Sequence, residues 1–163
     1  MAVVAINSQS IQDIDAQRVK FLNPLKSHAR IRENAETVTT NDDDSIGSVY
    51  RFVRIPSRAR VSEILIATDG EGTGGAGDVG LYHANGGVAV DADLFAAALA
   101  MATANNALSA TPALDPADFT KPLWEVLGLS EDPGVEYDVA ITFTSAVNAV
   151  RELSMRVRYV LAE

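Results

Sequence analysis

The sequence has 163 residues, of which 47% are hydrophobic and 21% charged, a balance that fits one folded domain and excludes a chain disordered throughout. It contains no cysteine, so disulfide bonds and cysteine-bound metals are excluded. The net charge of −9 is unevenly spread: residues 1–60 carry nine basic and seven acidic side chains, whereas residues 61–163 carry four and fifteen. This asymmetry disfavours nonspecific binding to nucleic acid and offers complementary faces for packing copies of the chain, or a partner, side by side.

Membrane and export signals are weak in this chain. The longest apolar run, Leu94–Met101, is too short to cross a bilayer. The first residues, MAVVAINSQSIQDID, lack the basic region followed by an apolar block that is typical of a signal peptide. We therefore expect a soluble protein that is not secreted.

Residues 1–27 contain scattered apolar side chains with no sustained period, and Asn23-Pro24 marks a break. We predict an extended N-terminal arm over these residues and a body over residues 28–163. The arm is too apolar to remain in water, so we expect it to contact an adjacent subunit or a partner protein. The side chains predicted to make that contact are Ile6, Ile11, Ile14, Phe21 and Leu22.

From Arg30 onward the pattern is typical of β-strands. The clearest period-two alternations are Tyr137–Thr144 and Leu153–Tyr159, each with four apolar residues on one face. Further strands are predicted at Ile31–Thr40, Val49–Ile55, Val61–Thr68, Asp78–Tyr82 and Gly87–Val90. With polar turns between them, these segments predict a mainly β protein, an antiparallel β-sandwich.

Two short helical insertions are predicted between the strands. Asp91–Met101 begins with an N-cap candidate and early acidic residues, then continues in alanine and leucine. Pro122–Gly128 has proline at an early position and glycine at its end. Within it Trp124 is predicted to anchor the segment in the core.

The glycine-rich segment 67–82, ATDGEGTGGAGDVGLY, contains the spacing Gly70-x-Gly72-x-x-Gly75. A dinucleotide site needs a helix after the glycine turn, and the residues that follow are typical of a strand. A calcium site would use Asp69, Glu71 and Asp78, although their spacing fits neither an EF-hand nor stacked repeats. The interpretation that fits best is an exposed hairpin loop, because glycine adopts positive φ at little steric cost.

Other polar residues give no recognisable catalytic group. The acidic run 41–45, NDDDS, is typical of a solvated turn, or less often of a site for a cation or a partner's arginines. The two histidines, His28 and His83, are too few for a histidine-rich metal site. Nucleophile-elbow, zinc-protease and phosphate-loop motifs are absent from the sequence. We expect no enzyme activity and no cofactor.

One basic cluster surrounds the strand that begins at Val49. It consists of four arginines, Arg51, Arg54, Arg58 and Arg60. Arginine pairs well with carboxylates at interfaces, so we expect pairing with acidic residues, either between subunits or within the chain. Nucleic acid is the alternative partner, but the only aromatic side chains near enough to stack on bases are Tyr50 and Phe52.

Several segments resemble a family of small virion proteins of tailed bacteriophages that are encoded beside the major capsid protein. The resemblance covers roughly residues 30–160 and no matching motif is catalytic. It rests on Arg30–Arg32, Asp44–Ser57 (DSIGSVYRFVRIPS), Arg60–Ile64, Asp78–Tyr82, Gly86–Phe95 (GGVAVDADLF), Leu123–Pro133 (LWEVLGLSEDP) and Tyr137–Val139. Proteins of this kind are capsid decoration, or cement, proteins, often β-sandwiches that oligomerise on the outer shell.

The resemblance implies a jelly-roll-like sandwich that binds the major capsid protein on the surface of the virion and stabilises the mature head. By analogy with three-fold positions on shells, it implies a homotrimer assembled in the bacterial host cytoplasm. In that setting the arginines of residues 51–60 are expected to pair with acids across a subunit boundary. Two alternatives remain: a neck or tail component, and a calcium- or carbohydrate-binding β-sandwich module. Neither a membrane nor nucleic acid is an expected partner.

Overall fold

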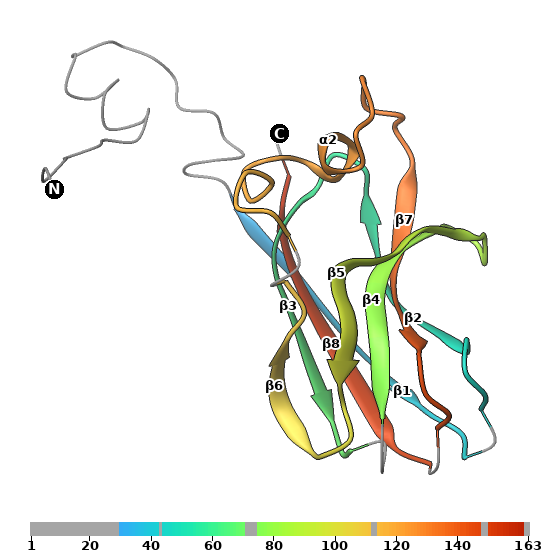
Figure 1. Ribbon diagram of the computed structural model, residues 1–163. Helices are drawn as coiled ribbons and strands as arrows, with labels where there is room; N and C mark the ends of the chain where they lie inside the picture. The colour runs from blue at the N-terminus through green and yellow to red at the C-terminus, as the bar shows by residue number, and fades with distance from the viewer. Residues whose placement is uncertain (1–29, 43, 71–74, 112–113, 148–149, 162–163) are drawn as a thin grey trace, which may run out of the picture.

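The computed structural model describes residues 30–42, 44–70, 75–111, 114–147 and 150–161 as two facing antiparallel sheets of four strands each (Figure 1). The mainly β prediction is therefore confirmed. The predicted arm, residues 1–27, lies outside the described residues. The strands are β1 (Ile31–Thr39), β2 (Val49–Pro56), β3 (Arg60–Thr68), β4 (Ala76–His83), β5 (Ala89–Ala100), β6 (Asn105–Ser109), β7 (Glu136–Phe143) and β8 (Glu152–Val160).

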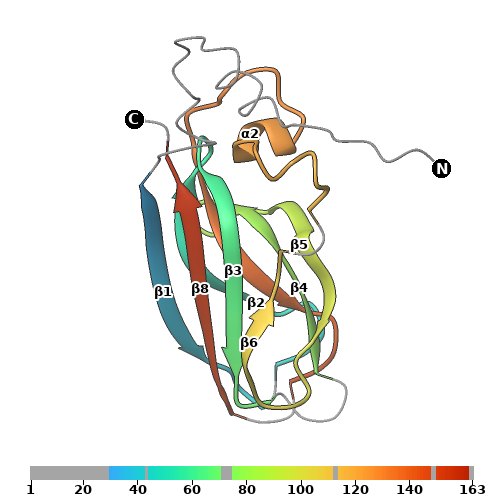
Figure 2. The same cartoon turned by 90° about the vertical axis from the view of Figure 1, so that its left-hand side faces the viewer.

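One sheet has the strand order β1-β8-β3-β6 and is called here the 1-8-3-6 sheet; the other has the order β2-β7-β4-β5 and is called the 2-7-4-5 sheet (Figure 2). Every ladder is antiparallel. In the 1-8-3-6 sheet, β8 lies between β1 and β3, so strands far apart in sequence are neighbours.

The core lies between the two sheets and follows the period-two alternation of their strands. In β8 the residues Leu153, Met155, Val157 and Tyr159 are buried. In β7 the side chains of alternate residues from Tyr137 to Phe143 are buried in the same cluster. The two alternations that were clearest in the sequence therefore form the inner faces of two central strands.

The helix predicted over Asp91–Met101 is wrong: all of these residues except Met101 belong to the long strand β5, which pairs with β4. Phe95 and Ala96 are buried in the core, and this packing outweighs the helix propensity of an alanine-rich segment. Of the short strand predicted at Gly87–Val90, Ala89 and Val90 form the beginning of β5. The prediction missed β6, whose sequence NNALS is short and polar.

The second predicted helix is present as a single turn, α2 (Leu123–Val126). Its position is fixed by the backbone N–H groups of Leu123 and Trp124, which donate to the carbonyl oxygens of Ala59 and Ser57. Leu123 is buried, whereas Trp124 is only half-buried. The predicted core anchor of this segment is therefore Leu123 and not Trp124.

Candidate functional site

The outer face of the 2-7-4-5 sheet carries a group of Arg51, Arg54 and Asp138, called here the arginine cluster. The Nε of Arg54 donates to Oδ1 of Asp138 at 2.7 Å, and its Nη2 donates to Oδ2 at 3.2 Å. The Nε of Arg51 lies 3.7 Å from Oδ2 of the same carboxylate. Asp138 is buried although its neighbours Tyr137 and Val139 face the core, because the two arginine side chains cover it from outside.

The arginine cluster also holds the β4–β5 hairpin against the sheet. Arg51 Nη2 donates to the carbonyl oxygen of Gly87 at 2.6 Å, and Arg54 Nη1 donates to Oδ1 of Asn85 at 2.9 Å. The Arg51 guanidinium lies 5.0 Å from the ring centroid of Tyr82, within cation–π range. The hydrogen bond to Asp138 raises the pKa of Arg54 above its ordinary value. Both arginines are thus paired within their own chain.

The other two arginines of the predicted basic group lie beyond the end of β2. Arg58 is exposed and borders a hollow with Ser57 and Asp132. Arg60 Nη1 donates to the carbonyl oxygen of Phe119 at 3.2 Å. Pairing of these arginines across a subunit boundary stays a prediction.

The outer face of the 1-8-3-6 sheet carries a different arrangement, three side chains in a row across β1, β8 and β3, called here the charged ladder. Arg158 Nε donates to Glu33 Oε2 at 2.5 Å, and its Nη1 donates to Glu63 Oε2 at 2.8 Å. The hydrogen bond from Arg158 lowers the pKa of Glu33 below its ordinary value. All three side chains are partly exposed, so each ion pair of the ladder adds little to stability.

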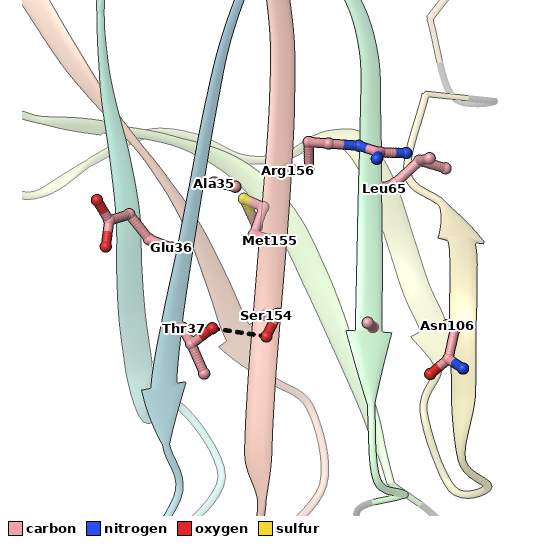
Figure 3. A pocket seen from close by; sticks show the side chains of 9 residues that line it. Ala35, Glu36, Thr37, Leu65, Asn106, Ser154, Met155 and Arg156 are labelled. Atoms are coloured by element: carbon pink, nitrogen blue, oxygen red, sulfur yellow. Dashed lines mark hydrogen bonds between the residues drawn. The ribbon is translucent and has the colours of Figure 1, made fainter.

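Beside the charged ladder lies a shallow hollow of about 560 Å³ (Figure 3). Its floor is made of small side chains from three strands, and the hydroxyls of Thr37 and Ser154 are 2.7 Å apart in a hydrogen bond. Arg156 reaches from β8 across β3 toward Leu65, and its Nε has no hydrogen-bond partner among the described residues. The lining residues are Ala35, Glu36, Thr37, Leu65, Ala67, Asn106, Ser154, Met155 and Arg156.

The predicted calcium ligands are not brought into a described site. Glu71 lies outside the described residues, and the described residues contain no group of three or more acidic or histidine side chains suited to a metal. Asp78 lies in β4, where its Oδ1 accepts the backbone N–H of Ala98 at 2.7 Å. Ala98 has a φ of 48°, so Asp78 supports an unusual backbone conformation in β5.

The acidic run 41–45 is joined to the body at Asp44. The carboxylate of Asp44 accepts a hydrogen bond from the hydroxyl of Tyr50, and its carbonyl oxygen accepts the N–H of Val147. At the neighbouring loop, Arg151 Nε donates to the carbonyl oxygen of Gly70 at 3.2 Å. These hydrogen bonds hold the acidic run and the loop at Gly70 against the body, as expected for turns between strands.

Sequence reasoning did not single out Asp138, Glu33 or Arg158. A usable signal was present for the last of these, because the alternation of Leu153–Tyr159 places Arg156 and Arg158 on the face opposite the core. The pairing of β1 with β8, which brings Glu33 to Arg158, was not visible in the sequence. The five arm residues, Ile6, Ile11, Ile14, Phe21 and Leu22, lie outside the described residues.

No protein-family model matches the chain, and no curated protein sequence gives a significant match. Among solved structures, the chain is similar to one in "Capsid of Ralstonia phage GP4", with a TM-score of 0.60 and 16% identity over 91% of this chain and 95% of that chain. It is also similar to a chain in "Cyanophage Pam1 capsid asymmetric unit", with a TM-score of 0.50 and 13% identity over 98% and 100%. These structures share the fold of this chain.

Among the described residues, no helix has the length and hydropathy needed to span a bilayer.

Proposed function

We propose that the protein is a structural virion protein that binds the outer surface of a tailed-phage capsid and stabilises the mature head, as a decoration protein does. The observation that carries this proposal is a likeness of fold over nearly the whole chain to a chain from the capsid of Ralstonia phage GP4. The likeness of segments such as Asp44–Ser57 to small phage virion proteins points in the same direction.

We also propose that the fold is a jelly roll. A jelly roll has eight strands in two sheets, formed by two Greek keys. The strand orders 1-8-3-6 and 2-7-4-5 fit this arrangement, since the hairpin β4–β5 lies within one sheet while β1 pairs with β8 across the length of the chain.

The mechanism is the sum of many weak contacts. Each copy contributes a modest interface to the major capsid protein and to other copies, and the symmetry of the shell multiplies these contacts by avidity. In this proposal the arm over residues 1–27 reaches a neighbouring subunit, and copies form a trimer at three-fold positions. Arg58 is the best placed of the four arginines to pair across a boundary, since it is exposed at a turn.

The test is co-sedimentation of the purified protein with expanded, undecorated heads of the phage that encodes it, counting bound copies per coat subunit. A fixed ratio comparable to the coat protein supports a decoration role. A few copies per particle favour a neck or tail component. No binding overturns the proposal and favours the calcium- or carbohydrate-binding module, which would show a calcium-dependent shift in melting temperature.

The arm is tested by deleting residues 1–22. We expect the body to keep its far-ultraviolet circular dichroism spectrum and to lose binding to heads. If the shortened protein occupies heads as fully as the intact chain, the arm does not make the contact.

A further inference from the structure

The outer edge of β1 carries no strand in the described part of the chain. The 1-8-3-6 sheet begins with β1, and Figure 2 shows this strand at the margin of the sheet. All nine residues from Ile31 to Thr39 pair with β8 without a register shift, so the strand is regular and has no β-bulge. Because backbone groups alternate between the two edges of a strand, a row of N–H and C=O groups points outward from β1.

The side chains of β1 are exposed on both faces. Only Val38 is half-buried, and Ile31 is 65% exposed. Arg32, Asn34 and Glu36 lie opposite Tyr159, Val157 and Met155, which face the core from β8. The inner side of β1 is therefore a row of polar side chains that continues the inner face of the sheet and is exposed in the described part of the chain.

This row is self-complementary when two copies of β1 run antiparallel about Asn34. In that register Arg32 of each copy lies opposite Glu36 of the other, and Asn34 lies opposite Asn34. Opposite charges in facing positions stabilise a pair of strands, and asparagine side chains can both donate and accept across the axis. Glu33 lies opposite Ala35, and it already pairs with Arg158 of its own chain.

Neighbouring registers are less favourable. A shift by one residue toward the C-terminus places Glu33 of each copy opposite Glu36 of the other, which is a repulsive contact, and a shift the other way places Arg32 opposite Ala35 and loses the facing charge pairs. It would also turn the polar row toward the opposite face of the partner's strand, because side chains alternate with a period of two. Centring the pair on Ala35 leaves Arg32 opposite Val38 and gives no facing pair of opposite charges.

We propose that β1 is an interaction surface for a second copy of this chain, and that two copies pair β1 to β1 about a two-fold axis at Asn34. The two 1-8-3-6 sheets then form one continuous sheet of eight strands. The contact goes beyond the proposed decoration role and does not rest on it. On a shell, a two-fold contact joins copies that belong to different three-fold sets.

The first test is the oligomeric state of the full chain and its charge variants by sedimentation velocity over a range of concentrations. We expect reversible dimers of the unaltered protein. Arg32→Glu and Glu36→Lys should each weaken dimerisation roughly tenfold, because the symmetry turns two attractive pairs into two repulsive ones. An equimolar mixture of the two variants, and the double variant, should recover dimerisation. Glu125→Lys, at an exposed position on α2, is the charge-matched control and should change nothing.

The second test fixes the register by cross-linking. The chain has no cysteine, so a single introduced cysteine reports only on its own position. Asn34→Cys should oxidise to a covalent dimer, since facing Cα atoms about 5 Å apart suit a disulfide. Thr37→Cys, roughly 20 Å from its counterpart in this register, should not. Near-ultraviolet circular dichroism checks that each variant folds.

Three outcomes overturn the proposal. One is an unaltered protein that stays monomeric at every concentration, as expected if residues 1–29 of the same chain cover this edge. Another is failure of the mixed charge variants to recover dimerisation. The third is equal cross-linking through residues 34 and 37. These measurements use no phage heads. The dimer proposal can therefore fail while the decoration proposal holds, and the decoration proposal can fail while the dimer proposal holds.

Discussion

The edge strands β5 and β1 complete their sheets in opposite ways. β5 follows β4 with several register shifts and contributes Phe95 and Ala96 to the core. β1 follows β8 without a shift and contributes no fully buried side chain. An edge strand can thus be secured mainly by buried packing, or mainly by its backbone ladder together with exposed polar contacts such as Glu33–Arg158 and Thr37–Ser154. In the described part of the chain, the second kind of strand, β1, leaves most of its side chains and its outer edge exposed.

Replacing the core side chain of β5 should have the largest effect. Phe95 is fully buried, so Phe95→Ala should lower the free energy of unfolding by about 4 kcal/mol through lost burial and a cavity. Val38→Ala, at the most buried position of β1, should cost about 1 kcal/mol. Denaturant unfolding of both variants measures the two losses in free energy of unfolding. Equal losses would contradict the difference proposed between β5 and β1.

A smaller loss is expected at Gly80, where β5 crosses close to β4. A Cβ there would lie 2.1 Å from the carbonyl oxygen of Asp91, so Gly80→Ala requires the backbone to move and should cost about 3 kcal/mol. Gly86→Ala is the control: its φ is 80° but nothing lies near its Cβ position, and about 1 kcal/mol is expected. Equal losses in thermal denaturation would show that β5 does not approach this closely.

Removing Asp138 tests how the 2-7-4-5 sheet holds its hairpin. Asp138→Ala leaves Arg51 and Arg54 without their carboxylate and should cost about 2 kcal/mol. Amide hydrogen exchange should accelerate at residues 84–88, because both arginines that hold this hairpin lose their anchor. Asp138→Asn keeps the shape of the side chain and one acceptor oxygen. Its loss of stability should therefore be smaller than that of Asp138→Ala. Unchanged exchange at the hairpin would contradict the anchoring role.

The smallest effect is expected on the charged ladder, and it depends on pH. The pKa of Glu33 is lowered by the hydrogen bond from Arg158, so the folded state favours the ionised carboxylate. Its stabilising contribution is present above the ordinary pKa of glutamate and is lost as the pH falls through the lowered folded-state value. Between about pH 6 and about pH 3, Glu33→Gln should therefore lose less melting temperature than the unaltered protein. Glu125→Gln is the control, and identical pH profiles for Glu33→Gln and the unaltered protein would contradict the assignment.

The sequence predicted most of the strands, but it did not predict β6 or the full length of β5. β2, β3, β7 and β8 were visible because alternating apolar residues have a strong period. β5 was mistaken for a helix, since Ala96, Ala97 and Ala98 favour helix locally while the burial of Phe95 that overrides them depends on distant strands. β6 was missed because five mostly polar residues carry little periodic signal.

The surface features were less predictable. The importance of Arg51 and Arg54 was visible from their grouping, but their common partner Asp138 lies more than eighty residues away in sequence. The charged ladder needs the registers of two ladders, β1 with β8 and β3 with β8, before its members can be matched. Such pairings depend on long-range register, which local patterns do not encode.

The position of β8 has a consequence for biosynthesis. It is the strand between β1 and β3, with Ile31 pairing with Val160 at one end. While the ribosome is still translating residues before β8, β1 and β3 have no partner for the edges that face each other. We therefore expect the 1-8-3-6 sheet to form only after β8 has been synthesised, with the slow folding that follows from pairing residues so distant in sequence. Until then nascent chains have open strand edges, and mispairing between chains would begin where polysomes bring several of them close together.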